Sequence, residues 1–169
     1  AFGHPDTHKE QADKNGEEEK RLLSRLAKKH GVNIIGGSVI EEREGKLYNT
    51  SRVFNRKGEE ICVYDKVHLY KDQEKNYYAA GDSIGLFTLD GISCGVAICY
   101  DMDFPEWIRC YAIQGVDILF APFAWPSEWM HHLEMVQKAR ALENQCFVAS
   151  AGLCKSDEDE NYRSGGTSI

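Results

Sequence analysis

The chain has 169 residues, of which 42% are hydrophobic and 28% are charged, as is typical of soluble globular proteins. This composition excludes a disordered chain, a collagen-like chain and a coiled coil. No apolar run approaches the roughly 20 residues of a membrane-spanning helix, and no N-terminal segment has the pattern of a signal peptide. The 27 acidic and 20 basic residues give a net charge of −7, the opposite of what nucleic-acid binding favours. We therefore expect a single domain over residues 1–169 that binds neither nucleic acid nor membrane.

Six cysteines are spread thinly along the sequence, and four of them lie inside apolar runs. They are Cys62, Cys94, Cys99, Cys110, Cys146 and Cys154. A disulfide framework is typical of much smaller secreted domains. The cysteine pattern therefore predicts reduced thiols and a cytoplasmic protein.

In the first half of the chain, residues 1–15 are polar and aperiodic and predict a loop. A helix is predicted over 17–30, because acidic residues begin this segment, basic residues end it and Gly31 follows. Alternating runs separated by turns then predict a meander of antiparallel strands, and a long polar loop comes after it. The strand runs are 32–42, 46–55 and 59–66, and the loop is 68–82.

The second half begins with a predicted hairpin, 85–89 and 92–99, whose second strand is apolar enough to be buried on both faces. Helical and strand patterns then alternate, which predicts a mixed α/β sheet covered by helices. The predicted elements are a helix over 105–115, a strand over 116–122, a helix over 131–144 and a strand over 146–152.

Cys99 is the most suggestive single residue. It is predicted to end a buried strand, and a polar turn separates it from a helix that begins at Pro105. Such strand-to-helix turns display nucleophiles beside backbone N–H donors, and a helix N-terminus favours the thiolate. An isolated cysteine in this position is nevertheless more often a core residue, as we expect for Cys94, Cys110 and Cys146.

Lys66 is the second candidate, because it closes a strand run and lies between Asp65 and Glu74, which could pair with it. Most lysines at strand ends are solvated. His68 could serve as a base toward Cys99, which would make a Cys–His hydrolase. No His or Cys spacing matches a zinc site, so we expect neither a metal nor another cofactor.

Four strings, in this order and spacing, carry a family resemblance: GKLYNTSRVFNRKGEEICVYDKVHLY, GVAICYDMDFPE, GVDILFAPFAWP and KARALENQCFVASAG. The chain resembles the nitrilase, or carbon–nitrogen hydrolase, superfamily. The most specific signal is D-K-x-H-L followed by C-Y-D-x-x-F-P-E, with 33 positions from Lys66 to Cys99. The string C-Y-D-M-D-F-P-E is more similar to amidase-type branches, including omega-amidase-like members, than to true nitrilases.

This resemblance implies a four-layer α-β-β-α sandwich with a Glu–Lys–Cys triad. It makes Cys99 the nucleophile, Lys66 the lysine of the triad and Glu74 a further glutamate near the active site, and it makes His68 a structural neighbour. The general-base glutamate would end an earlier buried strand, and no residue of this sequence matches it. Residues 1–169 are therefore expected to lack one or more N-terminal strands and a C-terminal part of the domain.

The implied reaction is hydrolysis of a small amide to an acid and ammonia through a thioester on Cys99. Three aromatic residues that follow strand ends, Tyr100, Phe123 and Trp125, are predicted to line the substrate pocket. Hydrolysis of a nitrile or an N-carbamoyl compound is an alternative within the family. A non-catalytic ligand-binding protein of the same fold is a second alternative, and a redox-active thiol protein ranks last.

The resemblance also implies a homodimer or a higher homo-oligomer, formed through the helices that follow the nucleophile. Trp107, Tyr111 and the predicted helix 131–144 would supply its contacts. Arg140, Glu143 and Asn144 are interpreted as a structural ion pair and cap.

Overall fold

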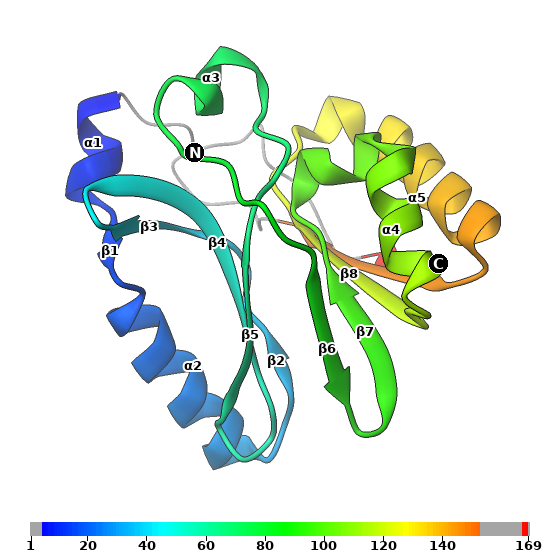
Figure 1. Ribbon diagram of the computed structural model, residues 1–169, viewed down its shortest axis with the longest axis horizontal. Coiled ribbons are helices and arrows are strands. Elements are labelled where there is room, and N and C mark those ends of the chain that lie inside the picture. Colours follow the sequence, from blue (N-terminus) through cyan, green and yellow to red (C-terminus); the bar gives the residue numbers. More distant parts are fainter. Residues whose placement is uncertain (1–4, 153–166, 169) are drawn as a thin grey trace. The chain divides into compact units, whose positions relative to one another are not determined.

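The computed structural model describes residues 5–152, 167 and 168, and its chain divides after Gly85 into two compact units (Figure 1). The first unit runs to Gly85 and the second begins at Leu86. Each unit contains one five-stranded sheet with helices against it.

The first unit is organised around the nine-residue strand β4. Its strands are β1 (Asp13–Lys14), β2 (Ile34–Ile35), β3 (Val39–Arg43), β4 (Lys46–Phe54) and β5 (Glu60–Asp65). β4 pairs antiparallel with β2, β3 and β5, and β1 pairs parallel with β3. The predicted antiparallel meander is therefore confirmed.

The strand predicted over 32–42 is two strands, β2 and β3, which pair with successive parts of β4. Gly36 lies in the break between them. A Cβ atom at Gly36 would lie 2.9 Å from the backbone oxygen of Arg52, so only glycine fits this close approach. The break keeps both short strands paired with β4.

Helix α2 (Glu17–His30) lies along one face of this sheet (Figure 1), and its predicted limits are confirmed. Ala27 is fully buried, and the Ser24 hydroxyl donates a hydrogen bond of 2.6 Å to the Gly58 carbonyl. Gly31 ends the helix in the left-handed region, with φ 63°, a conformation that glycine adopts without a Cβ penalty.

Two predicted loops contain helices. Residues 1–15 include α1 (Pro5–Glu10) and β1, and residues 68–82 include α3 (Lys71–Lys75). In the first of these, His8 is buried and its Nδ1 lies 3.1 Å from the Tyr78 hydroxyl oxygen. This contact joins residues 70 positions apart, so it leaves no local periodic pattern in the sequence.

The second unit has the sheet order β10-β9-β8-β7-β6. Its strands are β6 (Gly85–Leu89), β7 (Ile92–Val96), β8 (Ile118–Phe123), β9 (Phe147–Gly152) and β10 (Thr167–Ser168). β7, β8 and β9 are parallel, and β10 is antiparallel to β9. Asp90 and Gly91, both with positive φ, form the tight turn of the predicted β6–β7 hairpin.

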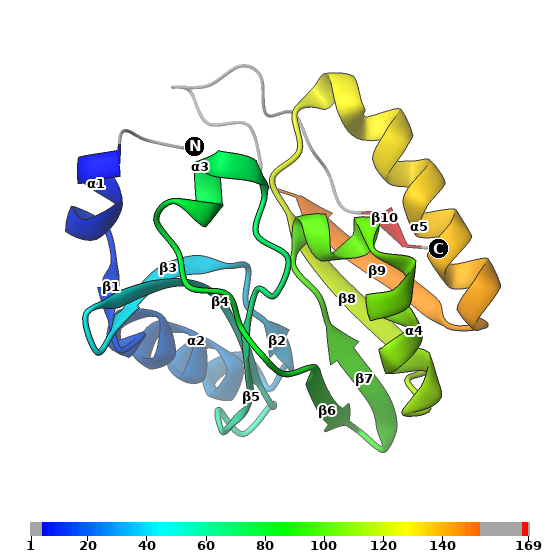
Figure 2. The ribbon, with the colours of Figure 1, turned by 45° about the horizontal axis from the view of Figure 1, so that its top comes forward.

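Helices α4 (Pro105–Ile113) and α5 (Met130–Asn144) lie against one face of this sheet (Figure 2). The Tyr111 ring covers Gly95, where a Cβ would lie 2.5 Å from a ring carbon, and the Gln137 amide donates 2.8 Å to the Ser150 hydroxyl. Sheet register places Gly95 and Ser150 on the same face. The alternation of strands and helices confirms the predicted mixed α/β class.

In the described part of the chain, no helix combines the length and the apolar character that crossing a membrane requires.

Candidate functional site

Lys66 and Glu74 form a buried ion pair in the first unit. The distance from Lys66 Nζ to Glu74 Oε2 is 2.7 Å, and each side chain is only 2% exposed. The Lys66 backbone is also fixed, because its N–H donates to the Asn49 carbonyl and its own carbonyl accepts from the Gly81 N–H. Although most lysines at strand ends are solvated, this ammonium group is held inside the protein.

Glu74 lies on α3 and receives three hydrogen bonds. Its Oε1 accepts from the Asn49 side-chain amide at 3.0 Å, and its Oε2 accepts from the Tyr70 backbone N–H at 2.5 Å as well as from Lys66. A buried ion pair is stable only when its remaining lone pairs are satisfied in this way. The carboxylate therefore fixes the lysine ammonium from one side.

Tyr78 lies beside Glu74, and His8 packs against Tyr78. The two rings stack at 5.6 Å, and the Tyr78 backbone N–H donates to the Glu74 carbonyl at 2.9 Å. Burial, together with the Glu74 charge, raises the pKa of Tyr78 to about 12, so its hydroxyl stays protonated. The sequence pattern did not single out His8 or Tyr78.

Cys99 lies in a strained turn of the second unit. β7 ends at Val96, three residues earlier than a strand ending at Cys99, and Cys99 begins the 3₁₀ helix η1 (Cys99–Asp103). Cys99 has φ 51°, a left-handed conformation that non-glycine residues rarely adopt and that is concentrated at functional sites. The Asp101 carboxylate closes the turn by accepting the Ile98 N–H at 2.8 Å.

Trp125 contacts the nucleophile candidate directly. Its indole Nε1–H donates to Cys99 Sγ at 3.0 Å. The Trp125 ring stacks on His132 at 5.3 Å, and His132 Nε2 lies 3.4 Å from Asp103 Oδ1. Trp125 was predicted to line the substrate pocket, and its donor role toward the sulfur was not visible in the sequence.

Arg140 holds the other end of the same turn. Its Nε donates to the Met102 carbonyl at 2.9 Å, and one Nη donates to the Asp103 carbonyl at 3.2 Å. Its second Nη pairs with Glu143 at 3.0 Å, and the Asn144 amide caps the Arg140 carbonyl. The predicted structural set is present, and it additionally anchors η1.

The other two predicted pocket residues lie in η1 and at the end of β8. Tyr100 is half-buried and packs edge-on against Phe104, with ring centroids 5.1 Å apart. Phe123 ends β8 and is 7% exposed. The structure thus brings Lys66 to Glu74 in the first unit, and Cys99 to Trp125 in the second.

The remaining described cysteines differ from Cys99 in their surroundings. Burial raises the pKa of Cys62 to about 11 and also raises the pKa of Cys94 and Cys146, so these thiols stay protonated. Cys110 was expected in the core, but it is exposed on α4. None of the five cysteines of the described residues forms a disulfide.

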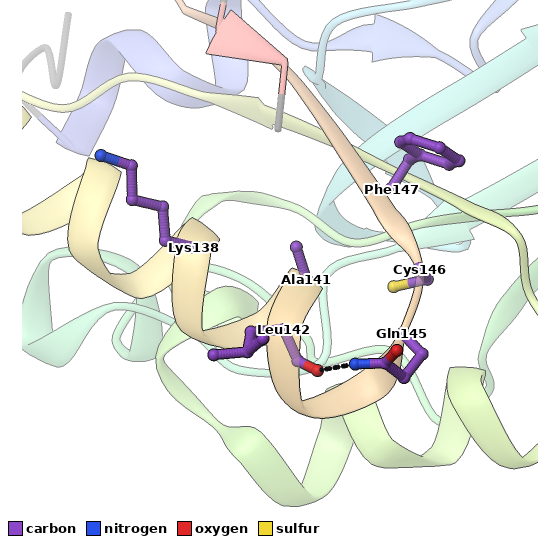
Figure 3. A pocket seen from close by; sticks show the side chains of 6 residues that line it. All are labelled: Lys138, Ala141, Leu142, Gln145, Cys146 and Phe147. Carbon is purple, nitrogen blue, oxygen red and sulfur yellow. Dashed lines mark hydrogen bonds between the residues drawn. The ribbon is translucent and has the colours of Figure 1, made fainter.

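An open pocket lies where α5 ends and β9 begins (Figure 3). It is lined by Lys138, Ala141, Leu142, Gln145, Cys146 and Phe147, and none of the predicted site residues is among them. Within residues 5–152 and 167–168, no three His, Cys, Asp or Glu side chains gather as metal ligands would.

Comparisons with known proteins match both sequence and fold. Residues 2–169 match the family model described as carbon–nitrogen hydrolase. A 2-oxoglutaramate amidase of Bacillus subtilis is 39% identical over 154 residues, which are 90% of this chain and 60% of that protein. An omega-amidase of Xenopus laevis is 38% identical over an alignment of 172 positions, which covers 94% of this chain and 60% of that protein.

A solved structure from Saccharomyces cerevisiae, a member of branch 10 of the nitrilase superfamily, has a TM-score of 0.81 at 28% identity. The match covers 89% of this chain and 56% of that one. The chain thus spans about 60% of the length of the curated relatives it matches. The likeness in fold agrees with the predicted α/β architecture.

Proposed function

The chain belongs to the carbon–nitrogen hydrolase family, and from this premise we propose that it hydrolyses a small amide to an acid and ammonia through a thioester on Cys99. The observation that carries the proposal is the turn at Cys99. The Cys99 backbone is left-handed there, and its thiol accepts a hydrogen bond of 3.0 Å from the Trp125 indole N–H. Strained turns after a strand are where α/β hydrolases display nucleophiles. Relatives named as amidases support an amide substrate.

In the proposed reaction, Cys99 Sγ attacks the amide carbon and forms a C–S bond, while the carbonyl electron pair moves onto oxygen. The thiol proton passes to a general base, the role that the family resemblance gives to a glutamate on an earlier strand. The tetrahedral intermediate collapses, the C–N bond breaks and ammonia leaves with a proton. Water then attacks the thioester, which releases the acid and restores the thiol.

We propose that Lys66 and the Tyr100 backbone N–H stabilise the negative oxygen of that intermediate, and that Glu74 positions Lys66. Support comes from the buried Lys66–Glu74 pair, in which three donors fix the carboxylate. One preorganised donor typically lowers the activation barrier by roughly 3–4 kcal/mol. A lysine ammonium needs no cofactor to provide this charge.

The substrate is proposed to be a small amide against Tyr100, Phe123 and Trp125. Aromatic side chains give a pocket apolar walls, and the buried Phe123 and half-buried Tyr100 fit that role. The words 2-oxoglutaramate and omega-amidase in the names of the relatives suggest an acyl group that carries its own carboxylate.

We further propose a cytoplasmic homodimer or higher homo-oligomer. The exposed apolar residues Met135 and Leu142 on α5, 61% and 74% exposed, support contact through this helix. Tyr111 was expected at the contact, but it is 1% exposed and its hydroxyl donates to the Val96 carbonyl, so it belongs to the core. A sedimentation mass equal to a single chain would contradict the oligomer.

The test is ammonia release from matched panels of amides, nitriles and N-carbamoyl compounds. We expect the amides to turn over best. The rate of ammonia release should fall on the order of 10⁴-fold or more in Cys99→Ala and about 10²–10³-fold in Lys66→Met. Cys110→Ala removes an exposed thiol and serves as the matched control with unchanged rates. Full activity in Cys99→Ala would refute the mechanism, and preference for another panel would refute the substrate class.

A further inference from the structure

The first and last residues of η1, Cys99 and Asp103, contact two neighbouring parts of the chain. Cys99 contacts the loop between β8 and α5, and Asp103 contacts the first turn of α5. Trp125 donates its indole N–H to Cys99 Sγ at 3.0 Å, and His132 Nε2 lies 3.4 Å from Asp103 Oδ1. The two contacting residues are themselves stacked, with Trp125 and His132 ring centroids 5.3 Å apart and planes 24° from parallel. The stacked Trp125 and His132 side chains thus contact both ends of η1.

In the contact between Trp125 and Cys99, the indole is always the donor and the sulfur is always the acceptor. An indole nitrogen can only donate a hydrogen bond, and a donor at a sulfur stabilises the thiolate more than the neutral thiol, because hydrogen bonds to a charged acceptor are stronger. Trp125 is half-buried, so solvent competes only in part for its N–H. Trp125 therefore has the geometry and the polarity to favour the reactive form of Cys99.

We propose that Trp125 is a catalytic residue that donates its indole N–H to the Cys99 thiolate, and that His132, held by Asp103, is the positioning residue that aims this donor. The proposal rests on the proposed function only in taking Cys99 as the nucleophile. It adds to the proposed function a second role for Trp125, because a wall of the substrate pocket need not donate a hydrogen bond to Cys99.

Other charged groups border the turn and must be separated from this effect. Asp101 is fully buried and accepts the Ile98 N–H, while Arg140 donates to two carbonyls of η1. Glu128 accepts from the Trp129 indole at 3.2 Å. Asp103 and His132 face each other. Substitutions at Trp125 and Trp129 leave all of these charges in place, so a change in these charges cannot explain a difference between the two variants.

The experiment measures the rate at which iodoacetamide alkylates Cys99 as a function of pH, followed on the Cys99 peptide by mass spectrometry. The thiolate sulfur forms a bond to the methylene carbon and iodide leaves, so the rate follows the thiolate fraction. We expect Trp125→Phe, which keeps an aromatic ring, to move the midpoint upward by about one pH unit, a tenfold loss of thiolate below it. His132→Ala should also move the alkylation midpoint upward, but by a smaller amount.

Trp129→Phe is the matched control. Trp129 also contacts the His132 ring, but its N–H donates to Glu128 and not to sulfur, so its profile should equal that of the wild type. A Trp125→Phe midpoint equal to the wild-type value overturns the proposal, and so does an equal shift in Trp129→Phe.

A second measurement needs no substitution in the titrated protein. The ¹⁵N–¹H indole resonance of Trp125, assigned by its loss in Trp125→Phe or, should that variant not fold, in Trp125→His, should titrate with the alkylation midpoint of Cys99. An indole resonance that does not move through that pH range overturns the proposal. Alkylation and NMR require no turnover, so a failed amidase assay with a shifted midpoint refutes the proposed function alone.

Discussion

The two units fix their reactive groups by different physical means. In the first unit, Lys66 is held by charge, in an ion pair with Glu74 that is 2% exposed on both sides. In the second, Cys99 lies in a left-handed backbone conformation, with φ 51°, and its half-buried thiol accepts a hydrogen bond from one neutral donor, the Trp125 indole. A cation needs its counter-charge when it is buried, whereas a thiol needs only a turn that presents it. The predictions below test this contrast.

The largest expected effect is on stability when the buried pair is broken. Lys66→Met leaves the Glu74 carboxylate buried without its cation, which should lower the free energy of unfolding by about 3–5 kcal/mol. Adding Glu74→Gln removes the orphan charge and should recover much of the loss. Urea unfolding measures both variants.

The control for this prediction is an exposed ion pair. Lys138 and Glu134 are one helical turn apart on α5, with side chains 59% and 55% exposed, so Lys138→Met should leave the urea midpoint unchanged. If Lys66→Met is as mild as Lys138→Met, the first unit is not held by charge.

A smaller effect concerns Glu19 on α2. Burial, aided by Glu41, Asp13 and Glu60 and opposed by Arg52, raises the pKa of Glu19 to about 7. Its buried Oε2 has no hydrogen-bond partner among the described residues. The folded state therefore keeps a proton that the unfolded state releases between pH 4.5 and 7, so this group makes stability fall as pH rises through that window.

Glu19→Gln should remove this fall. At pH 8 the variant should be more stable than the wild type by on the order of 1 kcal/mol, after discounting for solvent screening, and at pH 4 the two should be equal. Glu18→Gln removes a charge from the same first turn at an exposed position and controls for the helix dipole. Urea melts across pH measure all three, and a Glu19→Gln slope equal to the wild-type slope would refute the assignment.

The smallest expected effect tests strain in the second unit. Cys99→Gly should be more stable than Cys99→Ala by about 1 kcal/mol, because glycine adopts φ 51° without a Cβ penalty. The sign should reverse at Cys94, inside β7, where Gly should be less stable than Ala. Thermal melts of the four variants measure it. A less stable Cys99→Gly would show that the turn is not strained.

Much of the fold could be predicted because it depends on local patterns. The apolar stripe and end charges of 17–30 define α2, and the buried runs around Gly95 and Leu119 define parallel strands. What could not be predicted depends on distant contacts. α1 packs His8 against Tyr78, and the Arg52 carbonyl oxygen leaves no room for a Cβ atom at Gly36. Neither contact has a signature within one sequence window.

The candidate site divides in the same way. Family-like strings indicated Cys99, Lys66 and Glu74, and the structure adds the burial of the Lys66–Glu74 pair. The Trp125 donor and the Arg140 anchor depend on where α5 packs against η1. That packing is tertiary, so residue spacing along the chain does not reveal it.

The central claim is that Cys99 carries the acyl group. Amide turnover quenched with acid within milliseconds, followed by peptide mass spectrometry, tests it directly. The account predicts that the acyl mass is added to the Cys99 peptide, that it disappears as the amide is consumed, and that Cys99→Ala shows neither adduct nor turnover. Amide turnover by Cys99→Ala at the wild-type rate would contradict it.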